Sequence, residues 1–158
     1  MTEALYFTTL AGIALSVAGF AGLVTALRQD GRWSRTELWR LRNIVRASLT
    51  LVVVALLPSP IYRAVGADEP LTIRILSALL VIILLDGVRR AFAERQEWGS
   101  DYVRRVVAIV GAQIVLQVAN MQLASLPLVM FGFLIVLIYP MQLFLRVIRD
   151  FQPPIEGG

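Results

Sequence analysis

Long stretches without charge, separated by short charged segments, set the pattern of this chain. The first uncharged stretch runs from Ala4 to Leu27. The apolar segments that follow it before residue 150 are long enough for four more helices, and the last two of these are separated by a polar turn without charge. About 20 consecutive apolar residues, each rising about 1.5 Å along a helix, cover the hydrocarbon core of a bilayer. The pattern therefore predicts an all-α, polytopic membrane helical bundle with five transmembrane helices, at about residues 5–27, 40–60, 70–90, 102–121 and 126–147.

Capping residues and prolines mark the ends of these predicted helices. Ser34 and Glu37 match a capping box, in which each side chain bonds a free backbone N–H of the other, so the second helix should begin near Arg35. Pro58 should end or kink that helix at the opposite face of the membrane, because proline lacks an N–H and clashes with the preceding turn. Ser125 is the expected N-cap of the fifth helix.

The 158 residues are enough for one compact bundle. We expect residues 1–150 to form a single transmembrane helical domain. Residues 151–158 hold two prolines and two glycines and are expected to be a disordered tail. The segment Met1-Thr2-Glu3 has no positive charge, so the first helix is expected to be retained and not cleaved as a signal peptide.

Arginines are distributed unevenly between the two ends of the predicted helices. Segments 28–46 and 89–105 carry six and five of them, and two more, Arg146 and Arg149, lie at the C-terminal end of the fifth helix. The opposite end has only Arg63 and Arg74. Cytoplasmic loops of membrane proteins are enriched in Arg and Lys, so thirteen arginines against two predict an N-terminus outside and a C-terminus in the cytoplasm.

Cysteine, histidine and lysine are absent, so all fifteen basic residues are arginine. The first two absences remove disulfides, thiolate metal sites and the commonest ligand of metals and haem. Without lysine, neither retinal nor pyridoxal phosphate can be held as a Schiff base, and no cofactor is expected. The net charge of +4 comes from arginines that flank apolar spans, which favours the anionic inner leaflet, and not nucleic acid, as the partner.

The first predicted helix is rich in small residues. Ala14, Ala18, Gly22 and Ala26 recur every four residues and share one face. Such faces let helix backbones approach closely in lipid. One interpretation is that this face packs inside one subunit. The other is functional: the face forms a contact between subunits, or the helix lines a narrow pathway.

The fourth predicted helix carries a stripe of amides. Gln113, Gln117 and Asn120 lie within about 60° of one another when each residue turns the helix by about 100°. Buried amides need hydrogen-bond partners, and Gln142 on the fifth helix is a candidate partner for Gln113. The stripe predicts either hydrogen bonds that join helices or the wall of a hydrated groove or pore, because amides offer both donors and acceptors.

Asp86 is an acid within an otherwise apolar stretch, at the inner end of the third predicted helix. Arg46 lies at a similar depth on the antiparallel second helix, and we expect the two to form an intramembrane ion pair. Arg89 and Arg90, three and four residues further on, compete for Asp86 from the same helix. A gate or an ion-binding carboxylate is the alternative interpretation.

The fifth predicted helix contains Tyr139-Pro140. Pro140 leaves a backbone carbonyl without its helical donor and should kink the helix. A hinge is one interpretation, and an ordinary irregularity of a membrane helix is the other.

Catalytic motifs are missing from the sequence. It has no carboxylate near the middle of a span, no nucleophile–base set, no phosphate-binding loop and no filter-like motif. We therefore expect a non-enzymatic protein that self-associates and forms, or contributes to, a channel or transport pathway. The alternative is an accessory or scaffold subunit of a larger membrane complex.

Two short segments, Gly19-Phe20-Ala21-Gly22 and the Arg-Leu-Arg at Arg40 to Arg42, resemble small uncharacterised bacterial multi-span membrane proteins. This resemblance implies no activity. Together with basicity that comes from arginine alone and the strong charge asymmetry, it fits a bacterial inner membrane as the location.

The arginine distribution can be tested by labelling, because the chain has no cysteine of its own. Single cysteines placed within residues 28–42 and 89–105 should both react with a membrane-impermeant maleimide from the cytoplasmic side. Labelling of these two segments from opposite sides of the membrane would contradict the five-helix topology.

Overall fold

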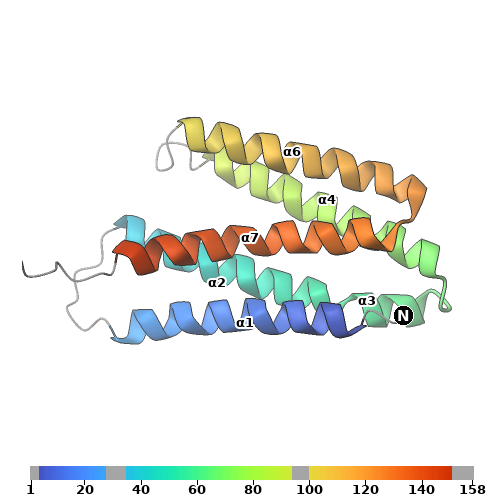
Figure 1. The fold of residues 1–158 in the computed structure, drawn as a ribbon, viewed down its shortest axis with the longest axis horizontal. Coiled ribbons are helices and arrows are strands. Elements are labelled where there is room, and N and C mark those ends of the chain that lie inside the picture. Colours follow the sequence, from blue (N-terminus) through green and yellow to red (C-terminus); the bar gives the residue numbers. More distant parts are fainter. Residues whose placement is uncertain (1–3, 28–34, 94–99, 151–158) are drawn as a thin grey trace, which may run out of the picture. The chain divides into compact units, whose positions relative to one another are not determined.

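The computed structural model describes residues 4–27, 35–93 and 100–150, and Figure 1 shows the helices along this part of the chain. They are α1 (Ala4–Leu27), α2 (Arg35–Leu56), α3 (Pro58–Ala64), α4 (Glu69–Ala93), α6 (Ser100–Leu123) and α7 (Leu126–Asp150). Five segments are long and apolar enough to cross a membrane, with Glu37–Ala64 counted as one of them. This confirms the prediction of an all-helical protein with five candidate membrane spans.

The chain divides into two compact units. One contains residues 57–135, which form α3, α4, α6 and the first part of α7. The other contains residues 5–56 and the chain from residue 136 onward, which form α1, α2 and the rest of α7. The sequence pattern predicts one domain over residues 1–150, and the described parts of both units lie within that range. The predicted tail at residues 151–158 lies outside the described residues.

Two of the predicted helix boundaries are found where the sequence indicates them. α2 begins at Arg35, although Ser34 of the predicted capping box lies outside the described residues. α2 ends at Leu56, and Pro58 is the first residue of α3. Proline is favoured there because the first turn of a helix leaves its N–H groups without intrahelical partners.

A Schellman motif ends α3 and brings the chain into α4. Gly66 has a φ of 71°, and its N–H donates to the Arg63 carbonyl at 3.3 Å. The N–H of Ala67 donates to the Tyr62 carbonyl at 2.8 Å, which completes the pair of bonds that define this helix end. Asp68 then caps α4, because its Oδ1 accepts from the N–H of Leu71 at 2.9 Å.

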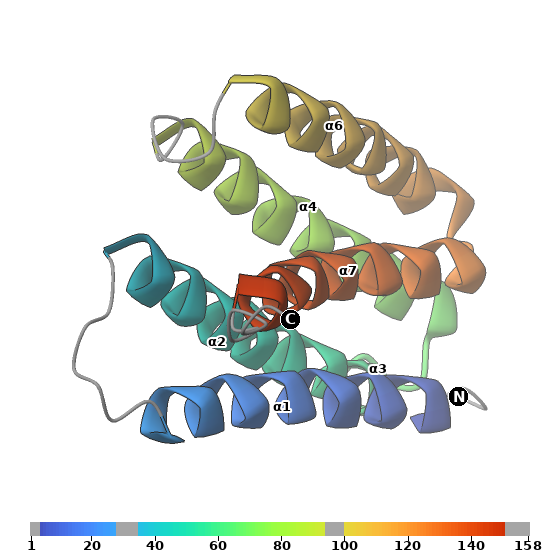
Figure 2. The same ribbon diagram turned by 60° about the vertical axis from the view of Figure 1, so that its left-hand side comes forward.

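In the first unit, α4 and α6 pack along each other, and Figure 2 shows them side by side. α4 turns one face inward, and its buried side chains recur every three or four residues: Thr72, Ile73, Leu76, Ser77, Leu80 and Leu84. The first part of α7 adds Val129 and Phe133, both fully buried. The core of this unit is therefore mainly apolar on α4 and α7, with polar contributions from Thr72 and Ser77 of α4 and from α6.

In the second unit, each helix also buries a single face. Ala14 and Ala21 on α1 and Ile44 on α2 have almost no exposed surface. Phe20 of α1 meets Phe144 of α7, with ring centroids 6.1 Å apart. Small side chains such as these on α1 are the kind that allow close helix packing.

Candidate functional site

Three buried amides on α6 form the polar centre of the first unit. Gln113 is 3% exposed, and Gln117 and Asn120 are 0% exposed. Their spacing of four and three residues places them on one face of the helix. The structure thus brings the three stripe residues of α6 together inside the unit, away from its surface.

Asn120 makes hydrogen bonds with every polar atom of its side chain. Its Nδ2 donates to Ser77 Oγ on α4 and to the Ser125 carbonyl, both at 3.0 Å. Its Oδ1 accepts from the Ser125 N–H at 2.9 Å. One amide therefore joins α4, the end of α6 and the start of α7.

The turn from α6 to α7 is shaped around this amide. Ala124 has a φ of 50°, and its N–H donates to the Asn120 carbonyl at 2.8 Å, as in a left-handed helix end. Ser125 precedes α7, and its carbonyl also accepts from the Val129 N–H at 3.4 Å. Ser125 therefore holds the N-cap position that the sequence predicts.

Gln117 joins α6 to the first turn of α7. Its Nε2 donates to the Leu128 carbonyl at 2.9 Å. This bond also fixes the orientation of the amide, because the opposite orientation would set two carbonyl oxygens against each other. The Gln117 Oε1 is buried and has no hydrogen-bond partner among the described residues.

Gly132 on α7 leaves room for the amides. A Cβ added there would lie 2.6 Å from Gln117 Nε2, 2.9 Å from Leu80 Cδ1 and 3.0 Å from Gln113 Nε2. These distances are shorter than van der Waals contact, so any side chain at this position would displace its neighbours. Gly132 is thus the residue that allows α7 to approach the amide face of α6.

Gln113 is the least satisfied member of the cluster. Its Nε2 is buried and finds no acceptor in the part of the chain that the structure describes. Gln142, its candidate partner, is exposed and belongs to the second unit. The pairing of Gln113 with Gln142 stays a prediction.

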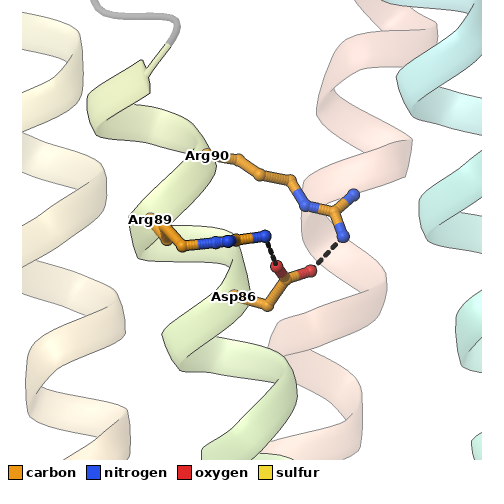
Figure 3. Close-up of polar contacts among 3 residues, drawn as sticks. All are labelled: Asp86, Arg89 and Arg90. Atoms are coloured by element: carbon orange, nitrogen blue, oxygen red, sulfur yellow. Dashed lines mark hydrogen bonds and ion pairs between the residues drawn. The ribbon is translucent and has the colours of Figure 1, made fainter.

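Asp86 is held by arginines of its own helix (Figure 3). Its Oδ1 lies 3.2 Å from Arg89 Nη2, and its Oδ2 accepts from Arg90 Nη2. Both carboxylate oxygens of Asp86 are therefore bound by Arg89 and Arg90. Residues three and four positions away on the same helix can form such pairs without a second helix to position them. Arg46 is exposed and belongs to the second unit, so its expected pairing with Asp86 stays a prediction.

The predicted small-residue face of α1 divides into a buried and an exposed part. Ala14 and Ala18 are buried, whereas Gly22 and Ala26 are exposed. A Cβ added at Gly22 would meet no other atom within 4 Å among the described residues. The buried pair, Ala14 and Ala18, is consistent with packing inside the subunit. The exposed pair, Gly22 and Ala26, is available for a contact with another helix.

Pro140 is buried inside α7, and the helix continues through it. Its missing N–H is the one that would donate to the carbonyl of Val136, four residues earlier. Val136 is also the residue at which the second unit resumes along α7. The predicted hinge residue thus lies one turn beyond the point where the chain passes between the units.

The amide cluster can form hydrogen bonds but has no group that ionises near neutral pH. Among the described residues, no three His, Cys, Asp or Glu side chains come together as a metal site would require. Sequence reasoning found the amides but missed Gly132 as the residue that accommodates them. A single glycine within an apolar span was the signal, since small residues mark close helix contacts in membranes.

Gly132→Ala should destabilise the protein by about 1–3 kcal/mol, because the new Cβ must push the Gln117 amide away from the Leu128 carbonyl. Gly111→Ala is the matched control, since a Cβ at that helical glycine meets nothing within 4 Å in the described structure. It should be neutral or slightly stabilising. Thermal unfolding in one detergent compares the two, and equal midpoints would contradict the tight contact at Gly132.

A comparison with protein families, characterised proteins and solved structures finds no match for this chain. Function is therefore inferred from the chain's own residues.

Proposed function

We propose that this protein is a non-enzymatic accessory or scaffold subunit of a membrane assembly, in which its helices serve as packing surfaces. The observation that carries this proposal is the enclosure of the α6 amides. Asn120 and Gln117 are fully buried. Asn120 hydrogen-bonds to Ser77 and Ser125, and Gln117 hydrogen-bonds to the Leu128 carbonyl. Amides used in this way hold helices together and do not face a continuous water path.

The ion pair of α4 supports the same proposal. A carboxylate that binds a permeant ion or gates a path needs coordination positions that are free to change. Both oxygens of Asp86 already bind guanidinium groups of Arg89 and Arg90. The group is therefore better suited to fix the inner end of α4 than to exchange ligands.

The surface of α1 offers a place for association. Gly12, Gly19 and Gly22 are exposed, and a Cβ at any of them would be free of other described atoms within 4 Å. Exposed glycines let a second helix come close, and packing contacts are what drive helix association in lipid. The partner is a second copy of the chain or a different membrane subunit.

The proposed orientation has the N-terminus outside and the C-terminus in the cytoplasm of a bacterial inner membrane. Its support is the uneven distribution of arginines along the sequence. In this orientation Arg89, which is 81% exposed, lies near the anionic inner leaflet.

A channel or transport pathway is the second candidate function, and one observation favours it. Gln113 Nε2 and Gln117 Oε1 have no partners among the described residues, although both atoms are buried. A hydrated path would satisfy them. This support is narrower, because it concerns two atoms and not a continuous polar surface.

Association is tested by measuring the mass of the purified protein in mild detergent and in nanodiscs, with identification of proteins that co-purify. We expect complexes larger than one chain, and Gly19→Leu should shift them toward the monomer because it blocks close helix approach. Gly87→Leu is the control, since Gly87 is also an exposed, open helical glycine but lies on α4. A strict monomer without co-purifying subunits would contradict the proposal.

Flux measurements on reconstituted protein separate the two candidates. Solute or ion flux that the wild type supports and Gln117→Leu abolishes would favour the pathway over the accessory subunit. A wild-type protein that assembles but passes no solute is the result expected for an accessory subunit.

A further inference from the structure

Two buried polar atoms in the first unit are complementary to each other in their chemistry. Gln113 Nε2 is a hydrogen-bond donor and Gln117 Oε1 is an acceptor, and neither has a partner among the described residues. The two side chains are four residues apart on α6, so they lie on successive turns of one face. A donor and an acceptor are thus left without partners on successive turns of one helix face.

Such atoms are costly in a membrane protein. An unpaired amide in an apolar environment keeps the full penalty of its desolvation, and lipid offers no water to reduce this penalty. Buried polar groups without a protein partner commonly bind ordered water. A further molecule is therefore needed to complete the hydrogen bonds of Gln113 Nε2 and Gln117 Oε1.

The surroundings restrict the answer by charge. A bound cation would need acceptors alone and a bound anion would need donors alone, whereas this pair offers one of each. Leu80 and Gly132, which lie next to the amide groups, and Asn120, on the same face of α6, carry no charge that would balance an ion. The ligand must therefore be neutral and must both accept and donate.

Size restricts the answer further. Gln113 and Gln117 are 3% and 0% exposed, and both of their Nε2 atoms lie within 3.0 Å of the position that a Gly132 Cβ would take. Side chains this deeply buried and this closely packed favour the smallest ligand that offers both a donor and an acceptor. Among neutral molecules with a donor and an acceptor, water is small enough.

We propose that a single buried water molecule bridges these two side chains, accepting from Gln113 Nε2 and donating to Gln117 Oε1. The bridge completes a chain of hydrogen bonds that runs from Gln113 through the water to Gln117, and from Gln117 Nε2 to the Leu128 carbonyl of α7. Gln113 thereby contributes to the α6–α7 contact without touching α7 through a direct hydrogen bond. The bridge uses the same two atoms that favour the second candidate function, and an isolated water would satisfy them without a continuous pathway.

A crystal structure of the full chain grown in a lipid mesophase, at a resolution that shows ordered water, tests the proposal directly. We expect one isolated water within hydrogen-bond distance of both Gln113 Nε2 and Gln117 Oε1. A direct hydrogen bond between the two amides, or a water that contacts one of them alone, would overturn the bridge.

A solution measurement keeps the test independent of crystals. With glutamine side chains labelled with nitrogen-15, the Gln113 amide protons should show a magnetisation-transfer peak to a long-lived water. That peak should disappear in Gln117→Met, which removes the acceptor but keeps the apolar volume. If the wild type lacks the peak, or Gln117→Met retains it at full intensity, the proposal is wrong.

Discussion

The absence of water from the hydrocarbon core is the constraint on which the rest of this structure depends. Each polar group must find a partner inside the protein, and hydroxyls can do so within their own helix. Thr8 donates to the Leu5 carbonyl at 3.0 Å and Ser16 to the Gly12 carbonyl at 2.9 Å, so both can remain exposed on α1. Ser48, buried on α2, departs from this rule, because its Oγ has no partner among the described residues.

Amide side chains differ from hydroxyls, because the backbone of their own helix cannot supply hydrogen-bond partners for all of their polar atoms. Asn120 reaches α4 and the start of α7 for its bonds, and Gln117 reaches the first turn of α7. The need to pair these atoms therefore specifies which helices lie together, where lipid removes the hydrophobic preference of one apolar face for another. Gly132 makes this arrangement possible by leaving out the Cβ that would otherwise collide with both glutamines.

Features that depend on local spacing could be predicted from the sequence, and features that depend on distant contacts could not. The five spans, the helix break at Pro58 and the shared face of the amides all follow from periodicity and proline geometry. The partnership of Asn120 with Ser77 joins residues 43 positions apart, and no local pattern encodes it. Asp86 illustrates the same division, since the partners that the structure gives it are its neighbours on the helix.

α7 belongs to both units, because the division of the chain falls within this helix. Its first part packs in the amide-centred unit, and its second part belongs to the unit that contains α1 and α2. Pro140 removes the helical bond to the carbonyl of Val136, the first residue of that second part. The backbone ladder of α7 therefore lacks one hydrogen bond in the first turn of the part that belongs to the second unit, and a missing bond of this kind is a common cause of helix bending. The hinge interpretation of Pro140 rests on that missing bond and stays a prediction.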